Sequence, residues 1–261
     1  MTNNLLIDDL RQNNRYDVEC FSEIGKRAEQ QDFGYLGVND NEILAVICDG
    51  MGGIEGGAIA SRVAVEKFVE CYGYSEQHPG KQTWMQNAAD LVDETVYSLQ
   101  DNAGNRLNSG TTLVAVNIND NMMSWVSVGD SRLYIIRNGE ILQITNDHNY
   151  FLQLNQQLES GEINKSQYYS ESRDGEALIS FIGMGGLTLK DVSYEPIGII
   201  SGDTVLLCTD GVYRALSDEF LLNSVICSST AKQIEKKITD AIDEIGAKDQ
   251  DNYTLVIIRI N

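Results

Sequence analysis

Proline and histidine are scarce in this sequence, which contains two residues of each type among its 261. No Gly/Ser-rich or Pro-rich stretch marks a linker, and no internal repeat is present. These absences favour a single compact domain over 1–261. The two histidines, His78 and His148, are too few to favour a dedicated zinc site.

Cysteine offers no metal or redox motif either. No Cys-x-x-Cys pair occurs, and the number of cysteines is odd: Cys20, Cys48, Cys71, Cys208 and Cys227. No secretory signal is recognised at the start of the sequence. This combination predicts a reducing, cytoplasmic location.

Basic residues are in short supply, with 19 Lys and Arg against 39 Asp and Glu, and the net charge is −20. Such a surface repels phosphate backbones and anionic lipids, so neither nucleic acid nor a membrane is an expected partner. No apolar run approaches the roughly 20 residues that span a bilayer. The acidity reflects either a solvated surface or carboxylates that converge on cations, and composition alone does not distinguish these.

Hydrophobic residues make up 42% of the chain, enough for a sizeable core. Short runs rich in β-branched and aromatic residues, separated by Asn, Asp or Gly, predict strands. These runs are Phe33–Val38, Ile43–Cys48, Thr111–Ile118, Met123–Val128, Leu133–Ile136, Thr204–Cys208 and Tyr253–Ile260. Because most connections between neighbouring strands are short, antiparallel pairing is expected.

Apolar residues recur at helical spacing in Ala58–Tyr72, Thr83–Leu99 and Thr230–Ile245. Helices grouped between runs of strands indicate an α+β architecture. The polar section at 149–190 has weak periodicity, so we expect an irregular segment that forms a flap subdomain beside a site.

Two apolar strands end in the same way, in Asp-Gly. One ends in Asp49-Gly50 and the other in Asp210-Gly211. Such a strand brings its last carboxylate to the rim of the sheet, and the glycine lets the backbone turn or approach a ligand closely. Either segment alone is more often an ordinary turn.

Acidic residues also stand at the start of two strands, Asp32 before Phe33–Val38 and Asp251 before the last strand. Antiparallel neighbours place the start of one strand beside the end of the other. We therefore expect Asp32, Asp49, Asp210 and Asp251 to meet at one edge of the sheets.

Carboxylates gathered in this way repel one another unless cations lie among them. Oxygen ligands with little His or Cys suit magnesium or manganese. Two such ions about 3.5–4 Å apart can hold a bridging water and lower its pKa, which prepares it for attack on phosphorus. Arg27 either supplies a guanidinium for two phosphate oxygens or forms an ordinary surface salt bridge.

Further short motifs, taken in order along the chain, resemble the protein phosphatase 2C family of metal-dependent (PPM-type) phosphatases, in its bacterial form. Besides the segment from Arg27 to Asp32, they are Asp49-Gly50-Met51-Gly52-Gly53, Ser109-Gly110-Thr111-Thr112, Val128-Gly129-Asp130-Ser131-Arg132, Cys208-Thr209-Asp210-Gly211-Val212 and Asp251-Asn252. The resemblance runs from Gly25 to the C-terminus. It implies two antiparallel sheets packed as a sandwich with helices on both outer faces, a four-layer αββα arrangement.

The resemblance also implies roles for matched positions. Asp49 would bridge two metal ions, and the Gly50 carbonyl would coordinate one of them. Asp210 and Asp251 would hold one ion, Asp32 would lie in the outer shell of the other, and Arg27 would bind the substrate phosphate. Asp130 matches a ligand of a third, weaker metal, with Asp191 as a loosely aligned companion. The alternative for Asp130-Ser131-Arg132 is a simple turn between two strands.

Some positions depart from the family pattern. Gln30 and Gln31 stand where Asn or Glu is common, and Met51 stands where some members have a histidine proposed as a general acid. Ser180-Phe181-Ile182-Gly183 stands where the family usually has Thr-Arg before Ala-Leu-Gly, which points to a different substrate preference.

The predicted function is hydrolysis of phosphoserine and phosphothreonine on proteins by attack of a metal-bridging water. Manganese or magnesium would be the cofactor, and a serine/threonine kinase and its substrates would be the partners of a monomeric enzyme. The alternatives are a phosphatase of small metabolites, an inactive phosphoprotein-binding module and a calcium-binding structural domain. A contiguous Asp-x-Asp-x-Asp-Gly loop, which the last would need, is not present.

Overall fold

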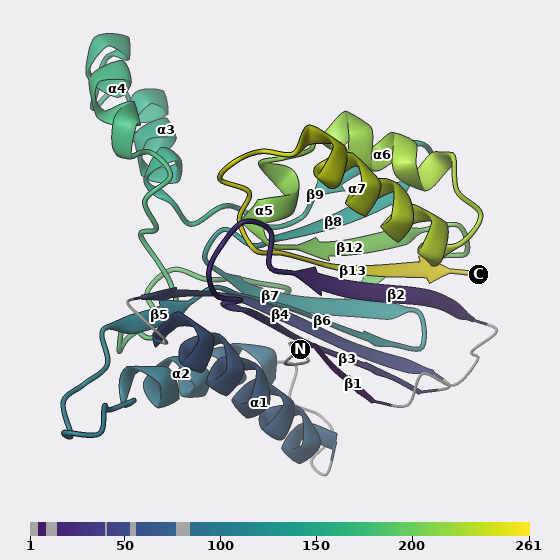
Figure 1. Cartoon of the computed structure of the whole chain (residues 1–261), viewed down its shortest axis with the longest axis horizontal. Helices are drawn as coiled ribbons and strands as arrows, with labels where there is room; N and C mark the ends of the chain where they lie inside the picture. Colours follow the sequence, from purple (N-terminus) through teal and green to yellow (C-terminus); the bar gives the residue numbers. More distant parts are fainter. Residues whose placement is uncertain (1–4, 9–14, 40, 53–55, 77–83) are drawn as a thin grey trace.

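Two β-sheets lie face to face at the centre of the molecule, with helices on both outer faces (Figure 1). The computed structural model describes residues 5–8, 15–39, 41–52, 56–76 and 84–261. Gly53 of the glycine-rich motif, His78 and the predicted helix start at Thr83 lie outside the described residues. This layered arrangement confirms the α+β sandwich implied by the resemblance.

The first sheet has the order β1-β3-β4-β6-β7-β10, and β5 and β11 pair with β4 and β7. These strands are β1 (Leu5–Asp8), β3 (Asp32–Val38), β4 (Glu42–Gly52), β5 (Ser109–Thr111), β6 (Leu113–Asn119), β7 (Met122–Val128), β10 (Asp191–Val192) and β11 (Ile197–Gly198). All pairs are antiparallel except β1 with β3, which is parallel. No strand was expected at β1.

The second sheet has the order β2-β13-β12-β8-β9 and is antiparallel throughout. Its strands are β2 (Tyr16–Glu23), β8 (Arg132–Arg137), β9 (Glu140–Gln143), β12 (Thr204–Cys208) and β13 (Tyr253–Ile260). The sequence analysis missed β2 because five of its eight residues are only partly buried, so its hydrophobic alternation is weak.

The unbroken apolar run of β4 has a physical reason, since both of its faces are covered. Leu44, Val46 and Cys48 pack toward α1 (Gly56–Glu76) and α2 (Trp84–Tyr97). Ala45 and Ile47 pack between the two sheets. β12 repeats the pattern between the sheets and a third cluster under α6 (Asp218–Ile226) and α7 (Ala231–Ile245). The two Asp-Gly strands therefore lie in the middle of their sheets, with apolar residues buried on both faces.

The flap differs from the prediction of an irregular segment, which was wrong for much of 149–190. It contains α3 (Tyr150–Ser160), α4 (Lys165–Glu171) and a 3-10 turn (Ser172–Asp174), and the helices project away from the sandwich (Figure 1). Asn149 and Asn164 cap the two helices, but Leu154 is the one buried residue of α3, and α4 has none. Capping rather than an apolar stripe supports these helices, so periodicity could not find them.

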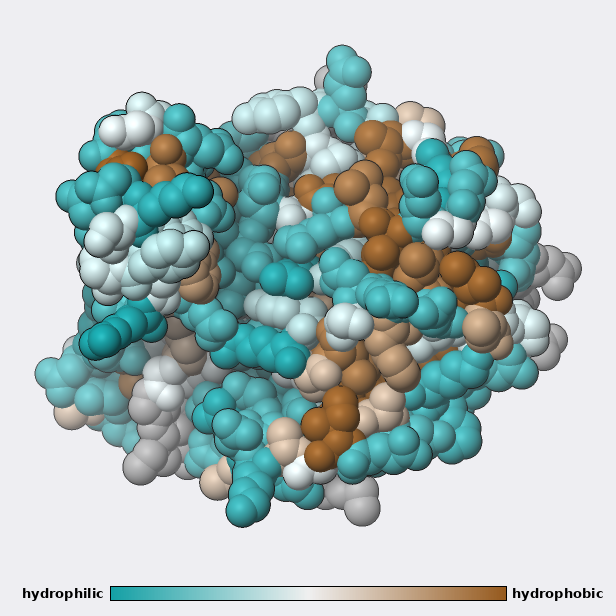
Figure 2. Space-filling model, turned by 90° about the horizontal axis from the view of Figure 1, so that it is seen from above, coloured by the Kyte–Doolittle hydropathy of each residue, from teal (hydrophilic) through white to brown (hydrophobic). Residues whose placement is uncertain are grey.

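Figure 2 shows a hydrophilic hollow between the flap and the body of the protein, with hydrophobic residues gathered over the body beyond it. No helix within the described residues combines the length and apolarity that crossing a bilayer requires. All five cysteines carry free thiols.

Candidate metal centre

The strand-terminal acids meet at one end of the sandwich. Asp32 and Asp49 face each other across the β3–β4 ladder. Asp210 follows β12 as the first residue of α5 (Asp210–Tyr213), and Asp251 lies just before β13. The structure therefore brings together the four acids that the sequence pattern placed at one edge.

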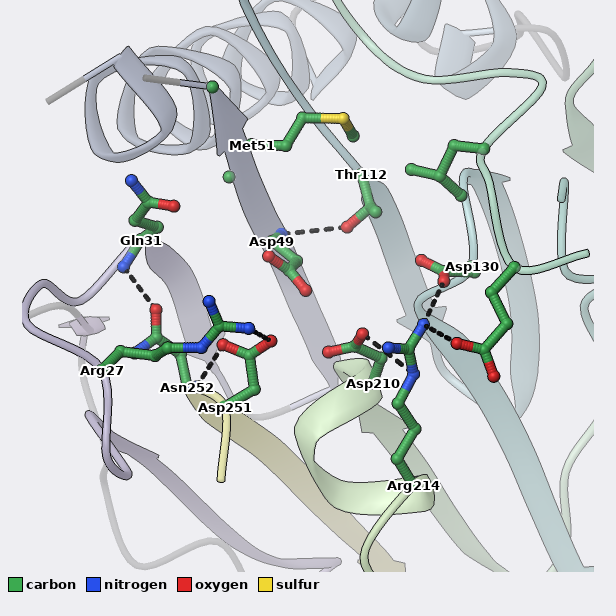
Figure 3. A pocket seen from close by; sticks show the side chains of 14 residues that line it. Arg27, Gln31, Asp49, Met51, Thr112, Asp130, Asp210, Arg214, Asp251 and Asn252 are labelled. Carbon is green, nitrogen blue, oxygen red and sulfur yellow. Dashed lines mark hydrogen bonds and ion pairs between the residues drawn. The ribbon is translucent and has the colours of Figure 1, made fainter. Parts of the chain in front are cut away.

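A cavity of about 310 Å³ opens among these acids (Figure 3). Its lining consists of Arg27, Gln31, Asp49, Gly50, Met51, Gly52, Thr112, Asp130, Glu176, Leu178, Asp210, Arg214, Asp251 and Asn252. Six of the eight predicted site residues are in this lining. Asp32 lies behind the floor of the cavity, and Asp191 is elsewhere.

Backbone contacts fix the floor at Asp49 and Gly50. The Asp49 N–H donates to Thr112 Oγ1 at 2.9 Å, and the Asp49 carbonyl accepts the Thr112 N–H at 2.8 Å. The Gly50 N–H donates to the Gln31 carbonyl at 3.1 Å. A Cβ on Gly50 would lie 2.1 Å from the Gly57 carbonyl oxygen, so a side chain cannot be accommodated without movement of α1. The floor thus requires glycine for close packing.

Asp32 is a buried carboxylate, 1% exposed, held by the hydroxyl groups of Thr209, just after β12, and Thr254 in β13. Its Oδ2 accepts hydrogen bonds from Thr209 Oγ1 at 2.9 Å and Thr254 Oγ1 at 2.7 Å. Burial raises the pKa of Asp32 to about 7, the two hydroxyls oppose the rise, and the carboxylates of Asp210 and Asp251 add to it. Asp32 therefore carries unfavourable charge that a nearby cation would relieve.

The other acids show the same electrostatic strain. Burial raises the pKa of Asp49 well above its ordinary value, and the carboxylates of Asp32 and Asp210 raise it further. Burial also raises the pKa of Asp210, with Arg214 opposing the shift. Burial followed by the charge of Asp210 raises the pKa of Asp130 to about 6. The cluster holds more negative charge than the described protein groups around it neutralise.

Arg27 reaches the cavity from the loop between β2 and β3. Its Nη2 lies 2.6 Å from Asp251 Oδ2, and its side chain is 57% exposed. Asn252 anchors this loop, because its Oδ1 accepts the Gln31 N–H at 2.8 Å and its Nδ2 donates to the Ile24 and Glu29 carbonyls. Arg27 is thus an ion-paired group at the rim with further N–H donors, which fits a contact with phosphate oxygens.

Arg214 is a second arginine in the cavity, and sequence reasoning missed it. Its Nε lies 3.1 Å from Asp210 Oδ2, and its Nη2 lies 3.3 Å from Glu176 Oε2 and 3.8 Å from Asp130 Oδ2. A signal was available, since Arg214 follows Asp210 at the i,i+4 spacing of helical ion pairs. Its contact with Glu176 of the flap could not be read from the sequence.

Asp191 lies outside the cavity, in a polar cluster at the base of the flap. Its Oδ2 accepts the Asn146 N–H at 2.6 Å, and its Oδ1 lies 3.4 Å from His148 Nε2. The hydrogen bonds and the nearby imidazole lower the pKa of Asp191 against the effect of burial. His148 is fully buried, and its Nδ1 accepts the Gly129 N–H at 3.2 Å. Both residues join the flap to the body.

The donor set at the floor fits hard divalent cations. Carboxylate oxygens from Asp49, Asp210 and Asp251 and the carbonyl of Gly50 are the oxygen ligands that magnesium and manganese accept. Within the described residues, Asp210 Oδ1 is buried and has no hydrogen-bond partner. Among the described residues, no three Asp, Glu, His or Cys side chains are close enough together to coordinate one metal ion. The acids line one cavity, and some of their carboxylate oxygens form ion pairs with Arg27 and Arg214.

The comparisons with known proteins agree with this geometry. The sequence model of the protein phosphatase 2C family matches residues 22–244. The serine/threonine phosphatase stp of Listeria welshimeri is 28% identical over 228 residues, which are 85% of this chain and 86% of that protein.

Solved structures share the fold. The serine/threonine phosphatase of S. agalactiae superposes with a TM-score of 0.78 at 24% identity, covering 94% of this chain and 100% of that one. The catalytic domain of the phosphatase PstP, solved in complex with two manganese ions, has a TM-score of 0.72 at 24% identity and covers 94% and 98%. With the family match over most of its length, this chain belongs to the protein phosphatase 2C family.

Proposed function

We propose that this chain is a divalent-metal-dependent phosphatase that removes phosphate from phosphoserine and phosphothreonine side chains of proteins. The observation that carries the proposal is the gathering of Asp49, Asp210 and Asp251 around one open cavity with Arg27 at its rim (Figure 3). Relatives that match most of this chain are named serine/threonine phosphatases, which supports it.

Manganese or magnesium is the cofactor in this proposal. Asp49, the Gly50 carbonyl, Asp210 and Asp251 would hold two ions, with Asp32 behind them in an outer shell. When bound, such ions supply a water of lowered pKa as nucleophile and neutralise charge on the phosphate.

The chain's own groups position the substrate and keep the floor in place. Arg27 has one N–H engaged with Asp251, and its remaining donors can bind phosphate oxygens and stabilise the charge that develops in the transition state. The hydroxyls of Thr209 and Thr254 hold Asp32 in a single orientation. The absence of a side chain at Gly50 lets this part of the cavity lining pack closely against Gly57 and Gln31.

The partners in this proposal are phosphorylated proteins and a bacterial serine/threonine kinase whose action the enzyme reverses, in a reducing cytoplasm. Nucleic acid and membranes are not partners, in keeping with a net charge of −20. The enzyme is proposed to act as a monomer.

The test is hydrolysis of a phosphothreonine peptide with manganese, with magnesium and with a chelator. We expect turnover that the chelator abolishes and that Asp49→Asn and Asp210→Asn each lower by about 10²–10³-fold. Arg27→Ala should lower kcat/KM by about 10²-fold. Asp240→Asn, an exposed ion-paired acid on α7, is the matched control and should retain full activity. Turnover that persists with chelator would contradict the proposal, and peptide binding without turnover would favour the phosphoprotein-binding module.

A further inference from the structure

Three segments that are distant in the sequence meet at Arg214. Asp210 comes from α5, Asp130 from the turn between β7 and β8, and Glu176 from the flap. In Figure 3 the guanidinium lies on the opposite side of the cavity from Arg27 and points toward Asp130 and Asp210, and Glu176 is its third partner. Arg214 is therefore a cation already present between the floor and the flap.

The expected third metal does not fit this arrangement. Arg214 Nη2 lies 3.8 Å from Asp130 Oδ2, so a divalent ion bound to this carboxylate would lie close to the guanidinium, and the two positive charges would repel each other. The expected companion Asp191 is not in the cavity lining, and its carboxylate contacts Asn146 and His148. Within this cavity the acids beside Asp130 are Asp210 and Glu176, and Arg214 is ion-paired with all three, so they cannot together hold a further cation while Arg214 is in place.

We infer that Arg214 takes the place of a third metal ion in this chain, as a positioning residue that neutralises Asp130 and holds the returning segment of the flap beside the cavity through Glu176. The inference concerns the same site as the proposed function and rests on it for the meaning of the cavity. It assigns the side of the cavity at Asp130 and Glu176 to a fixed side-chain cation, and the floor at Asp49 and Asp251 to exchangeable metal ions.

The geometry explains how one side chain does both tasks. The short helix α5 begins at Asp210, and the Arg214 N–H donates to the Asp210 carbonyl at 2.9 Å, so the start and the end of the turn are held together. The side chain is 44% exposed, and its partner Glu176 is 65% exposed. The contact with the flap is therefore open to solvent and screened by salt, while Asp130 beneath it is 6% exposed.

Manganese stoichiometry, measured by equilibrium dialysis without any substrate, tests the first part. We expect about two ions per wild-type chain, about three after Arg214→Ala, and about two again after Arg214→Ala with Asp130→Asn. Arg214→Lys keeps the positive charge and should stay near two. Lys165→Ala, which removes an exposed positive charge from α4, should also stay near two.

Hydrogen exchange of the metal-free protein tests the second part. We expect Arg214→Ala and Glu176→Gln each to speed amide exchange in the flap by about two- to five-fold at low salt, with no further gain in the double variant. High salt should raise the wild-type rate toward that of the variants.

A third ion on the wild-type chain that Asp130→Asn removes would overturn the inference, and so would Arg214→Ala that still binds two ions. Amide exchange rates in the flap that are unchanged in both single variants would contradict the claim that Arg214 holds the flap through Glu176. None of these measurements uses turnover, so an inactive protein that gains an ion on Arg214→Ala would refute the proposed function and leave this inference standing.

Discussion

The floor and the roof of the cavity are held by different kinds of interaction. In the floor, Asp49 and Gly50 are fixed by strand register and by backbone hydrogen bonds to Thr112 and Gln31. The roof is the flap, whose Glu176 contacts Arg214 by a solvent-open ion pair of 3.3 Å. Backbone-fixed groups keep their places when one side chain changes, and groups held by exposed ion pairs do not.

Where the chain returns from the flap to the body, a buried side chain, Asp93, holds the backbone of residues 183–186; we call this contact the latch. The Asp93 carboxylate on α2 accepts the N–H groups of Gly183 at 2.7 Å, Met184 at 2.9 Å and Gly186 at 2.6 Å. Asp93 is 1% exposed, so this latch is stronger than the ion pair at Glu176. The comparison therefore predicts large effects in the floor, smaller ones at the latch and the smallest at the exposed ion pair.

The largest effect on stability is expected from Gly50→Ala. The new methyl group would lie 2.1 Å from the Gly57 carbonyl and 2.7 Å from the Gln31 carbonyl, so β4 and α1 must separate. We expect the free energy of unfolding in denaturant to fall by about 3 kcal/mol. Gly73→Ala in α1 meets nothing within 4 Å and should raise it by up to about 1 kcal/mol. Equal stability of the two variants would show that close backbone packing at Gly50 does not hold the floor in place.

The charge of the floor predicts a dependence of stability on pH when divalent cations are chelated. Burial raises the pKa of Asp32 from 3.8 to about 7, so the folded state keeps a proton that the unfolded chain releases. The unfolded state thus binds fewer protons between these values, and stability falls as the pH rises from about 4 to about 7. The expected loss is on the order of 4 kcal/mol.

Asp32→Asn isolates this contribution, because asparagine can still accept from Thr209 and Thr254 and does not ionise. The variant should have a flatter profile in denaturant unfolding at a series of pH values. Asp240→Asn on the exposed surface should keep the wild-type slope. A slope unchanged in Asp32→Asn would assign the pH dependence to other groups.

A smaller and more local effect is expected at the latch. Asp93→Asn loses the charge and presents an amide N–H₂ to at least one backbone N–H, so we expect a cost of about 1 kcal/mol. Amide exchange at residues 183–186 should quicken by about five-fold, with little change in the exchange of β4. Glu94→Gln, an exposed neighbour on α2, should change neither. Equal quickening in β4 and at 183–186 would mean that floor and roof unfold together.

Local sequence patterns were sufficient for the floor and for most of the sandwich. Asp49 and Asp210 were found because each follows an apolar run that is buried on both faces, and such runs are visible without a structure. The helix expected at Thr230–Ile245 was found for a similar reason, since α7 has a local cap at Thr230 and a local end at Gly246.

The roof was predicted poorly. The flap helices bury too few apolar side chains to show a 3.6-residue period. Outside the flap, β1 has only four residues and β2 is only partly buried, so neither strand was predicted. Asp191 was assigned from a loose alignment, and the structure places its carboxylate outside the cavity, against His148. The role of Asp191 as a metal ligand stays a prediction, and the inference about Arg214 is an alternative to it.

The sequence by itself determined the layered α+β class and the acids at the strand ends, because those depend on burial periodicity and on residues next to it. Only the tertiary structure decided which cations from distant segments face those acids. Arg27 meets Asp251 across 224 residues, and Arg214 meets Glu176 only because the chain that returns from the flap helices passes beside the cavity. Charge pairing between distant segments leaves no periodic trace along the chain, so the partners of each carboxylate emerge when the segments pack.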